Sequence, residues 1–200
     1  MLGDLLRLRL KALSTDEELA AFAEGFATTI TERTRGVVKG SVPLEYLRAS
    51  RVVAVVDGQG RQLAGYVVGW KQPLRLLDFV PEDARRTLPP PPGASWDDCC
   101  EITCLWRRPE VSPAFMGARV WPRAIREAIA TGKPYLLGGN QNAKLDNLYV
   151  DPTRVTLYVG PSAIGLPSRL ASFETRGLMG RTARIIVVET LKRLVGLGKK

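Results

Sequence analysis

The side chains that could transfer protons in this chain are carboxylates, tyrosines, lysines and cysteines, because its 200 residues include no histidine. The absence of histidine excludes a Ser-His-Asp triad, a Cys–His pair and a histidine base. Acid–base chemistry must therefore use the side chains named above, a water molecule or the amino terminus of the chain.

The three cysteines, Cys99, Cys100 and Cys104, lie close together in one apolar stretch. An odd, local set does not form a disulfide framework. Without histidine, a zinc site would need carboxylates or an unusual geometry, so we expect no metal. Cys104 also lacks a histidine that would activate it as a nucleophile. We expect the three thiols to pack as small hydrophobic groups at the start of a strand.

Two further segments place polar residues beside apolar runs. The first reads EITCLWRRPE over residues 101–110 and leads to Gly117, eight positions after Pro109. The second reads NAKLDNLY, in which Tyr149 follows Asn142 by seven positions. Their chemical roles depend on the elements that position them.

The first half of the chain predicts strands and helices from local patterns. Residues 5–10 alternate apolar and basic side chains, as a strand does. An N-cap with acids in the first turn, followed by apolar residues at helical spacing, predicts a helix over about 16–34. A shorter helix is expected at 44–49. The β-branched runs 51–56 and 61–70 flank an Asp-Gly turn and predict a β-hairpin.

The second half is less regular. Residues 71–97 look like an insertion with a short helix near Pro81, and the proline run that ends at Pro92 predicts a stiff surface spacer. Beyond it the pattern predicts a strand, a helix, a short strand, a short helix and a strand, over 100–106, 117–130, 135–137, 142–149 and 154–159. Residues 184–188 are strand-like, and 189–197 suit a helix. This mixed order indicates an α/β or α+β layered domain.

Composition narrows the class of protein. A hydrophobic fraction of 45% is enough to bury a core. The sequence contains no run of about 18 apolar residues, so we expect no transmembrane helix. The N-terminus carries the early acid Asp4 and lacks the layout of a signal peptide, so we expect a cytoplasmic protein. The net charge of +9 favours an acidic partner, such as CoA phosphates, an acidic carrier protein or nucleic acid. A basic solvated surface is the simplest alternative.

In element order and in the two polar segments, the chain resembles the GNAT (GCN5-related N-acetyltransferase) superfamily. Its members commonly have a strand, then Pro-Glu, then a loop whose last glycine stands where Gly117 does. They often have an asparagine after a strand and a tyrosine seven positions later, as Asn142 and Tyr149 are here. The resemblance implies an α/β (α+β) fold with a mixed central sheet, flanking helices and two parallel strands that splay apart near Leu105 and Leu137.

The resemblance also implies a domain organisation. Residues 1–160 would form a GNAT-like acyltransferase core, with 71–97 as a proline-rich insertion. Residues 161–200 would be a basic C-terminal segment that completes or extends the same domain.

The activity implied by the resemblance is transfer of an acyl group from acyl-CoA, such as acetyl-CoA, or from an acyl carrier protein, to an amine acceptor. Backbone groups between the splayed strands would bind the pantetheine amides. A helix that starts near Gly117 would point free N–H groups at the pyrophosphate. The residues implied in donor binding are Leu105, Trp106, Arg107, Met116, Gly117, Ala118, Arg119 and Asn142.

By the same resemblance, Glu101 stands where many relatives hold the general base, often acting through water, and Tyr149 would be the acid near the thioester sulfur. Structural alternatives exist for each residue. Glu101 suits a structural or edge carboxylate, and Tyr149 suits an amphipathic core tyrosine. Asn142 suits a helix cap, and Trp106 suits the core.

The loop before the helix departs from the family pattern, since residues 112–116 read SPAFM and Pro113 has no N–H. Arg119, Arg123 and Arg126 would then supply charge to phosphates, or form a solvated helix face. Two explanations stay open. The donor is held on an acidic carrier protein, as in relatives that resemble acyl-homoserine lactone synthases. Alternatively, the fold persists as a non-catalytic module that binds a protein or nucleic acid.

Overall fold

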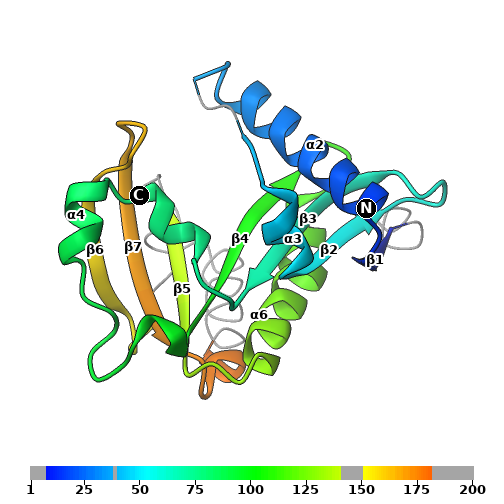
Figure 1. Cartoon of the computed structure of the whole chain (residues 1–200). Coiled ribbons are helices and arrows are strands. Elements are labelled where there is room, and N and C mark those ends of the chain that lie inside the picture. Colours follow the sequence, from blue (N-terminus) through cyan, green and yellow to red (C-terminus); the bar gives the residue numbers. More distant parts are fainter. Residues whose placement is uncertain (1–7, 38–39, 141–150, 182–200) are drawn as a thin grey trace, which may run out of the picture.

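One seven-stranded mixed sheet organises the chain in its computed structural model, which describes residues 8–37, 40–140 and 151–181. The order across the sheet is β1-β2-β3-β4-β5-β7-β6, and only β4 and β5 run parallel. The strands are β1 (Arg9–Leu13), β2 (Arg51–Val56), β3 (Gln62–Gly69), β4 (Cys99–Arg107), β5 (Tyr135–Asn140), β6 (Val155–Pro161) and β7 (Pro167–Glu174). The predicted α+β architecture is confirmed (Figure 1).

The β2–β3 hairpin forms as its sequence predicts. Both strands are almost entirely buried, which explains their β-branched composition. In the turn, the Asp57 carboxylate accepts the N–H groups of Gln59 and Arg61 at 2.9 and 3.0 Å. Gly60 adopts a φ of +82°, which a side chain would disfavour.

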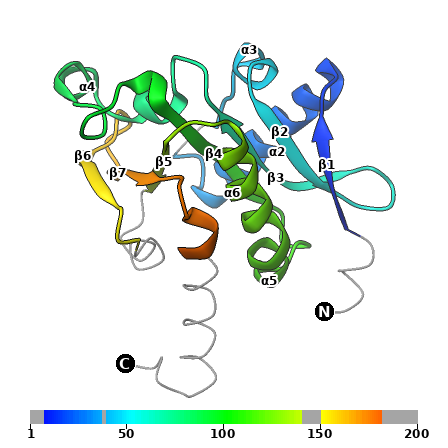
Figure 2. The same cartoon turned by 90° about the horizontal axis from the view of Figure 1, so that it is seen from below.

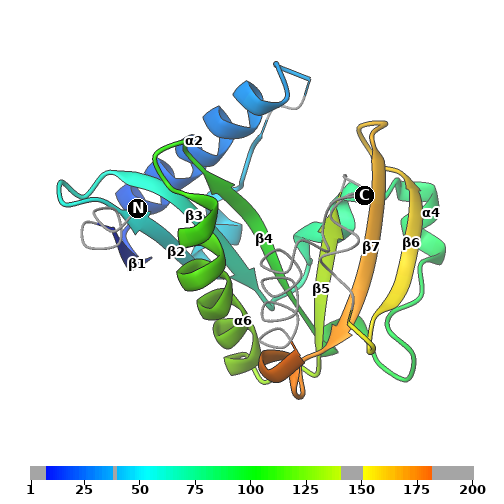
Figure 3. The same ribbon diagram turned by 180° about the vertical axis from the view of Figure 1, so that it is seen from behind.

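Helices cover both faces of the β2–β3–β4 part of the sheet. Helix α2 (Asp16–Arg33) begins with a capping box, in which Thr15 and Glu18 each bond the backbone of the other. It lies with α3 (Leu44–Arg48) on one face, and α6 (Trp121–Ala130) lies on the other (Figure 3). The helices predicted over 16–34 and 44–49 are therefore confirmed.

The segment between β3 and β4 carries a core of its own. It contains η1 (Arg75–Phe79), α4 (Glu82–Thr87) and η2 (Trp96–Asp98), and α4 matches the short helix predicted there. Leu74, Leu76 and Val80 are buried with Leu137 of β5 and Leu170 of β7. The stretch predicted as an insertion therefore covers the β5–β7–β6 part of the sheet, on the same side as α3 (Figure 2).

Strand β7 is a feature that the sequence did not predict. It lies between β5 and β6 and pairs antiparallel with both. Residues 167–174 therefore belong to the same sheet as β1–β5. The division at residue 160 stays a prediction, and the strand and helix expected over 184–197 lie outside the described residues.

Candidate functional site

Strands β4 and β5 pair over only three residues. Cys99, Cys100 and Glu101 are in register with Tyr135, Leu136 and Leu137. Beyond the Glu101–Leu137 pair, β4 continues to Arg107 beside β3, and β5 continues to Asn140 beside β7. The two strands diverge visibly from that point (Figures 1 and 3). We call the opening between their unpaired edges the seam, and it confirms the splay expected near Leu105 and Leu137.

The seam exposes main-chain groups on both edges. A strand bonds one neighbour through alternate residues, and the N–H and C=O groups of the remaining residues point to the other side. On β4 beyond Glu101 and on β5 beyond Leu137, those groups face the seam and have no partner among the described strands. Such groups require a partner of another kind, and the amides of an extended ligand fit that need.

A β-bulge in β4 adjoins the seam. Gly65 pairs with Trp106 and Val67 pairs with Thr103, so β4 has one extra residue at this point. Cys104 there has a φ of 50°, a left-handed conformation that is rare outside glycine. A bulge bends its strand and re-aims the residues around it. This bulge therefore turns the end of β4 away from β5.

The bulge also decides where the predicted donor-binding side chains lie on β4. Leu105 packs against the core beside α6. Trp106 is buried on the α2 side, where its ring meets Phe22 edge-on at a centroid distance of 5.9 Å and lies close against Gly25. The Trp106 side chain is therefore core, in agreement with the structural alternative. Arg107 donates from Nη1 to the carbonyl of Val111 at 3.1 Å and so ties down the loop after β4.

The helical run after β4 begins four residues earlier than the resemblance implied. It starts at Pro113 as α5 (Pro113–Phe115), continues through the π-helical η3 (Met116–Val120) and ends as α6. Gly117 therefore lies inside the helical run and not in the loop before it. The expectation that the helix starts near Gly117 is wrong, because Ser112 caps the run and Pro113 suits its first turn.

This early start uses up the amide donors of the first turn. Pro113 has none, the Phe115 N–H donates to Ser112 Oγ at 3.1 Å, and the Met116 N–H donates to the Ser112 carbonyl at 3.1 Å. The Ala114 N–H has no acceptor among the described residues. Of the other residues implied in donor binding, Met116 is buried in the core, whereas Ala118 and Arg119 are exposed.

Glu101 lies at the closed end of the seam, in the last β4–β5 pair, and its side chain is fully buried. Oε1 accepts the Tyr46 hydroxyl at 2.7 Å and the Arg75 N–H at 2.8 Å, and Oε2 accepts the Leu76 N–H at 2.7 Å. A carboxylate offers about four acceptor positions. Within the described residues, one position therefore remains, on Oε2, for a water molecule or a ligand.

Burial raises the pKa of the Glu101 carboxyl, although the hydrogen bonds from Leu76, Tyr46 and Arg75 oppose the rise. Burial also raises the pKa of Tyr46, which therefore remains a hydrogen-bond donor to Glu101. Gly69 is required beside them, since a Cβ there would lie 2.6 Å from the Tyr46 hydroxyl and 3.0 Å from Glu101 Oε1. Glu101 therefore joins β4, α3 and η1 at one point.

The cysteines pack as expected. All three are buried free thiols. Burial raises the pKa of Cys99 to about 12 and the pKa of Cys100 and Cys104 to about 11. They are therefore protonated at neutral pH and suit packing better than nucleophilic attack.

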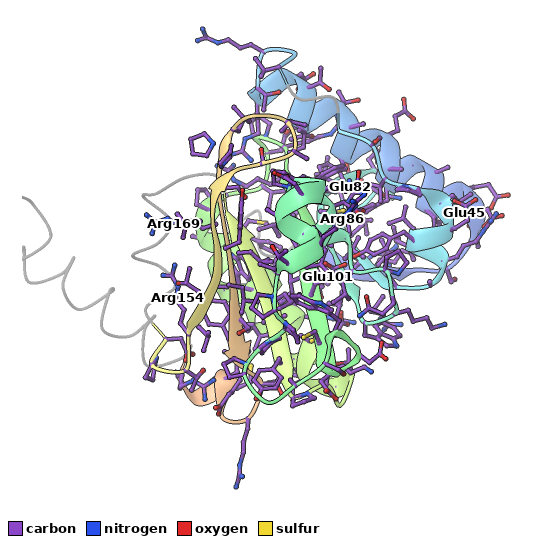
Figure 4. The ribbon with its side chains drawn as sticks, turned by 60° about the vertical axis from the view of Figure 1, so that its left-hand side comes forward. Glu45, Glu82, Arg86, Glu101, Arg154 and Arg169 are labelled. Carbon is purple, nitrogen blue, oxygen red and sulfur yellow. The ribbon has the colours of Figure 1, made fainter. Side chains whose placement is uncertain are left out.

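Figure 4 separates two groups of charged side chains. Glu101 lies in the interior, on the side of the sheet that α4 covers. Arg154 and Arg169 lie on the other side of the β6–β7 hairpin, away from α4. Basic side chains of the C-terminal strands thus belong to the face opposite the Glu101 cluster.

Two predicted site residues, Asn142 and Tyr149, lie outside the described residues. Within the described part of the chain, no group of three metal-ligating side chains occurs. The same part contains no helix that is long and apolar enough to cross a membrane.

Sequence reasoning missed Tyr46 and Arg75. Both reach Glu101 across long stretches of chain, with separations of 55 and 26 residues. Tyr46 read as one residue of a short helix, and Arg75 lay in the predicted insertion. The nearest signal was the charge of Arg75 within an otherwise apolar run from Leu74 to Leu77.

Comparison with known proteins identifies the fold. No family model and no curated protein sequence matches the chain. Solved structures do match it. FeeM, an N-acyl amino acid synthase from uncultured soil microbes, is 13% identical with a TM-score of 0.66, over 90% of this chain and 98% of FeeM.

Two further structures agree. MesI, a CoA-dependent acyl-homoserine lactone synthase, is 12% identical with a TM-score of 0.60, over 88% of this chain and 94% of MesI. A GCN5-related N-acetyltransferase from Kribbella flavida is 12% identical with a TM-score of 0.51, over 85% of this chain and 99% of that protein. Together with the splayed β4 and β5, these similarities show that the chain has the GNAT fold.

Proposed function

We propose that this protein is an N-acyltransferase that moves an acyl group from a thioester donor to a small-molecule amine. The seam is the observation that carries the proposal. Its three-residue pairing leaves main-chain groups on β4 and β5 that an extended pantetheine arm can bond. The solved structures that share the fold are described as an N-acyl amino acid synthase, a CoA-dependent acyl-homoserine lactone synthase and an N-acetyltransferase.

The donor would be held mainly by its pantetheine arm. Among the described residues, the first turn of the α5–η3–α6 run has one N–H group left for a phosphate, that of Ala114, so a pyrophosphate gains little there. The described candidates for binding the donor are the exposed Arg119 and the end of β4 near Leu105. Asn142 is a further candidate, which the sequence alone suggests. Acetyl-CoA, a longer acyl-CoA or an acyl carrier protein would all present the same arm.

The chemistry requires two proton transfers. The amine nitrogen forms a bond to the thioester carbonyl carbon, the carbon–sulfur bond breaks, the amine loses a proton and the sulfur gains one. We assign the first proton to Glu101, through a water molecule on the open position of Oε2. We assign the second to Tyr149, as the resemblance implies. We also propose that the protein is cytoplasmic, as its sequence predicts.

Calorimetry with acetyl-CoA, decanoyl-CoA and the matching S-acyl pantetheines tests the proposal. We expect at least one thioester to bind and to release free thiol when amines are added. We also expect the acyl-pantetheine to bind nearly as well as its CoA counterpart. Absence of binding by every thioester, including one on an acyl carrier protein, would overturn the proposal.

A matched pair of variants ties binding to the seam. Gly139→Val adds a side chain on the β5 edge, where a Cβ already meets Leu76 at 3.1 Å. Gly58→Val adds the same side chain in the β2–β3 turn, where a Cβ meets nothing within 4 Å. We expect the first variant to weaken thioester binding and the second to leave it unchanged.

A non-catalytic binding module is the second candidate, favoured by the net charge of +9 and the depleted helix start. Binding to nucleic acid would weaken steeply as salt rises. Retention on heparin or DNA at low salt, combined with no thioester binding, would favour this module over the enzyme. Negligible retention would remove it.

A further inference from the structure

Arg75 is fixed at the closed end of the seam. It is the first residue of η1, and η1 contacts both β4 and β5. The Arg75 N–H donates to Glu101 Oε1 at 2.8 Å, so the backbone of Arg75 adjoins the last β4–β5 pair. Its side chain lies over the Phe79 ring, with the guanidinium carbon 5.9 Å from the ring centroid. The guanidinium group also acts on Cys104 in the β4 bulge, through its charge and through a side-chain hydrogen bond, and both oppose the rise that burial causes in the pKa of Cys104.

Within the described part of the chain, the guanidinium group of Arg75 forms no salt bridge with a carboxylate. One Nη2 hydrogen bond goes to the carbonyl of Ser41, and the buried Nε has no acceptor among the described residues. Two other partly buried arginines differ in this respect. Arg123 Nε lies 3.1 Å from Glu127, and Arg181 Nε lies 2.7 Å from Asp151.

The charged and titratable groups around Arg75 form no ion pair with its guanidinium group among the described residues. The Arg75 charge opposes the rise that burial causes in the pKa of Glu101, but Glu101 already accepts three hydrogen bonds, from the Tyr46 hydroxyl and from the N–H groups of Arg75 and Leu76. Asp78, on the same 3-10 helix, pairs with Arg85 at 2.8 Å. The Cys104 thiol is protonated at neutral pH because burial raises its pKa to about 11. A cation with unused donors is therefore held beside the reactive end of the seam.

We propose that Arg75 binds the carboxylate of the acceptor, which makes the acceptor an amino acid or a close analogue with both an amine and a carboxylate. This inference rests on the proposed function. Arginine binds carboxylates through paired N–H donors. Because the Arg75 backbone bonds Glu101 directly, one small molecule can place its carboxylate on the guanidinium and its amine toward the Glu101 side. Arg75 thereby selects the acceptor, and Glu101 receives its proton.

A panel of three acceptors tests the inference on the full chain: an amino acid, its carboxamide and the amine that lacks the carboxyl group. We expect the amino acid to be used best. Arg75→Gln should raise its KM by about tenfold to hundredfold, the equivalent of one charge-assisted hydrogen bond. The same variant should leave the KM of the thioester and the rates with the other two acceptors nearly unchanged. Arg75→Lys should restore part of the preference.

Arg85→Gln is the matched control, because Arg85 lies on α4 and its charge is already paired with Asp78. Equal use of all three acceptors by the native protein would overturn the inference. So would an equal loss with all three in Arg75→Gln, which would show that Arg75 only links Ser41 to η1. Thermal unfolding of each variant separates this result from misfolding.

Measuring the binding of the amino acid in the absence of any thioester tests the inference separately from the proposed function. Calorimetry of the native protein with the amino acid and its carboxamide should show weak binding of the amino acid alone, lost in Arg75→Gln. If thioesters bind but the amino acid neither binds nor reacts, the proposed function stands and the inference fails. If the amino acid binds through Arg75 but no thioester binds, the proposed function fails and the carboxylate site stands.

Discussion

The two parts of the sheet on either side of the seam are held together differently. In the β1–β4 part, β2 and β3 pair along their lengths and are buried between α2 and α6. In the β5–β7–β6 part, a separate core beneath η1 supports the strands, and Val155 and Val159 of β6 are exposed. The two cores meet only at the paired end of β4 and β5, where Leu136 of β5 joins the core beside α6 and Cys99 of β4 joins the core beneath η1. A polar contact at Glu101 links the two parts at the same end.

Removing the charge of Glu101, which links the two parts of the sheet, should have the largest effect on stability and activity. In Glu101→Gln, an amide N–H₂ replaces one oxygen and faces a backbone N–H donor of Arg75 or Leu76. We expect a loss of about 2–3 kcal/mol in the free energy of unfolding and the loss of acyl transfer. Chemical denaturation and thiol release measure the two effects. Glu45→Gln is the control, because Glu45 is the exposed neighbour of Tyr46, and it should lose neither stability nor acyl transfer. A fully active Glu101→Gln would contradict the assignment of Glu101 as the base.

Paired glycine substitutions sharpen the comparison. A Cβ at Gly65 in β3 would lie 2.5 Å from the Phe22 ring and 2.6 Å from the Val53 carbonyl oxygen. At Gly139 in β5 it would meet only the flexible end of Leu76, at 3.1 Å, and a backbone oxygen at 3.7 Å. We expect Gly65→Ala to cost about 1–3 kcal/mol of stability and Gly139→Ala clearly less. Equal losses would show that both parts are packed equally tightly.

The smallest expected effect lies far from the seam, at the start of α2. The Lys11 ammonium and the N–H groups of Ser14 and Thr15 lower the pKa of Glu18 from 4.5 to about 2. The contribution of Glu18 to stability is therefore complete above about pH 4.5 and is lost as the pH falls toward 2. As this ion pair is partly exposed, we expect roughly 1 kcal/mol.

Thermal unfolding between pH 6 and 2 checks this expectation. Glu18→Gln should flatten the pH dependence of the melting temperature in that window. Glu17→Gln changes the same turn of α2 at an exposed position and should have a smaller effect. An unchanged pH profile in Glu18→Gln would contradict the role of its carboxylate.

The sequence predicted the β2–β3 hairpin and α2 well because their signals are local. The first strand was predicted over 5–10, whereas β1 spans Arg9–Leu13. The run of β-branched residues in β2, the Asp57 turn and the Thr15–Glu18 cap each act within a few residues. Strand β7 was missed because it combines Pro167 and polar residues with the consecutive buried pair Leu170–Ala171, which has neither strand nor helix periodicity.

The candidate site was predicted only in outline. The splay followed from a family resemblance and lies where it implied. The role of Glu101 as the base, implied by the same resemblance, stays a prediction. Tyr46 and Arg75 could not be predicted, because tertiary contacts across distant segments bring them to Glu101. The early helix start escaped notice because Gly117 matched the family spacing, while Ser112 and Pro113 determined the local backbone.

The position of β7 has a consequence for synthesis on the ribosome. Strand β5 emerges with only a three-residue attachment to β4, and its other neighbour, β7, begins some 27 residues after β5 ends, at Pro167. A nascent chain that stops before Pro167 therefore carries β5 with a bare edge, which invites pairing with other chains. Nonsense or frameshift lesions between β5 and Pro167 should thus yield aggregation and not a shortened, partly working protein.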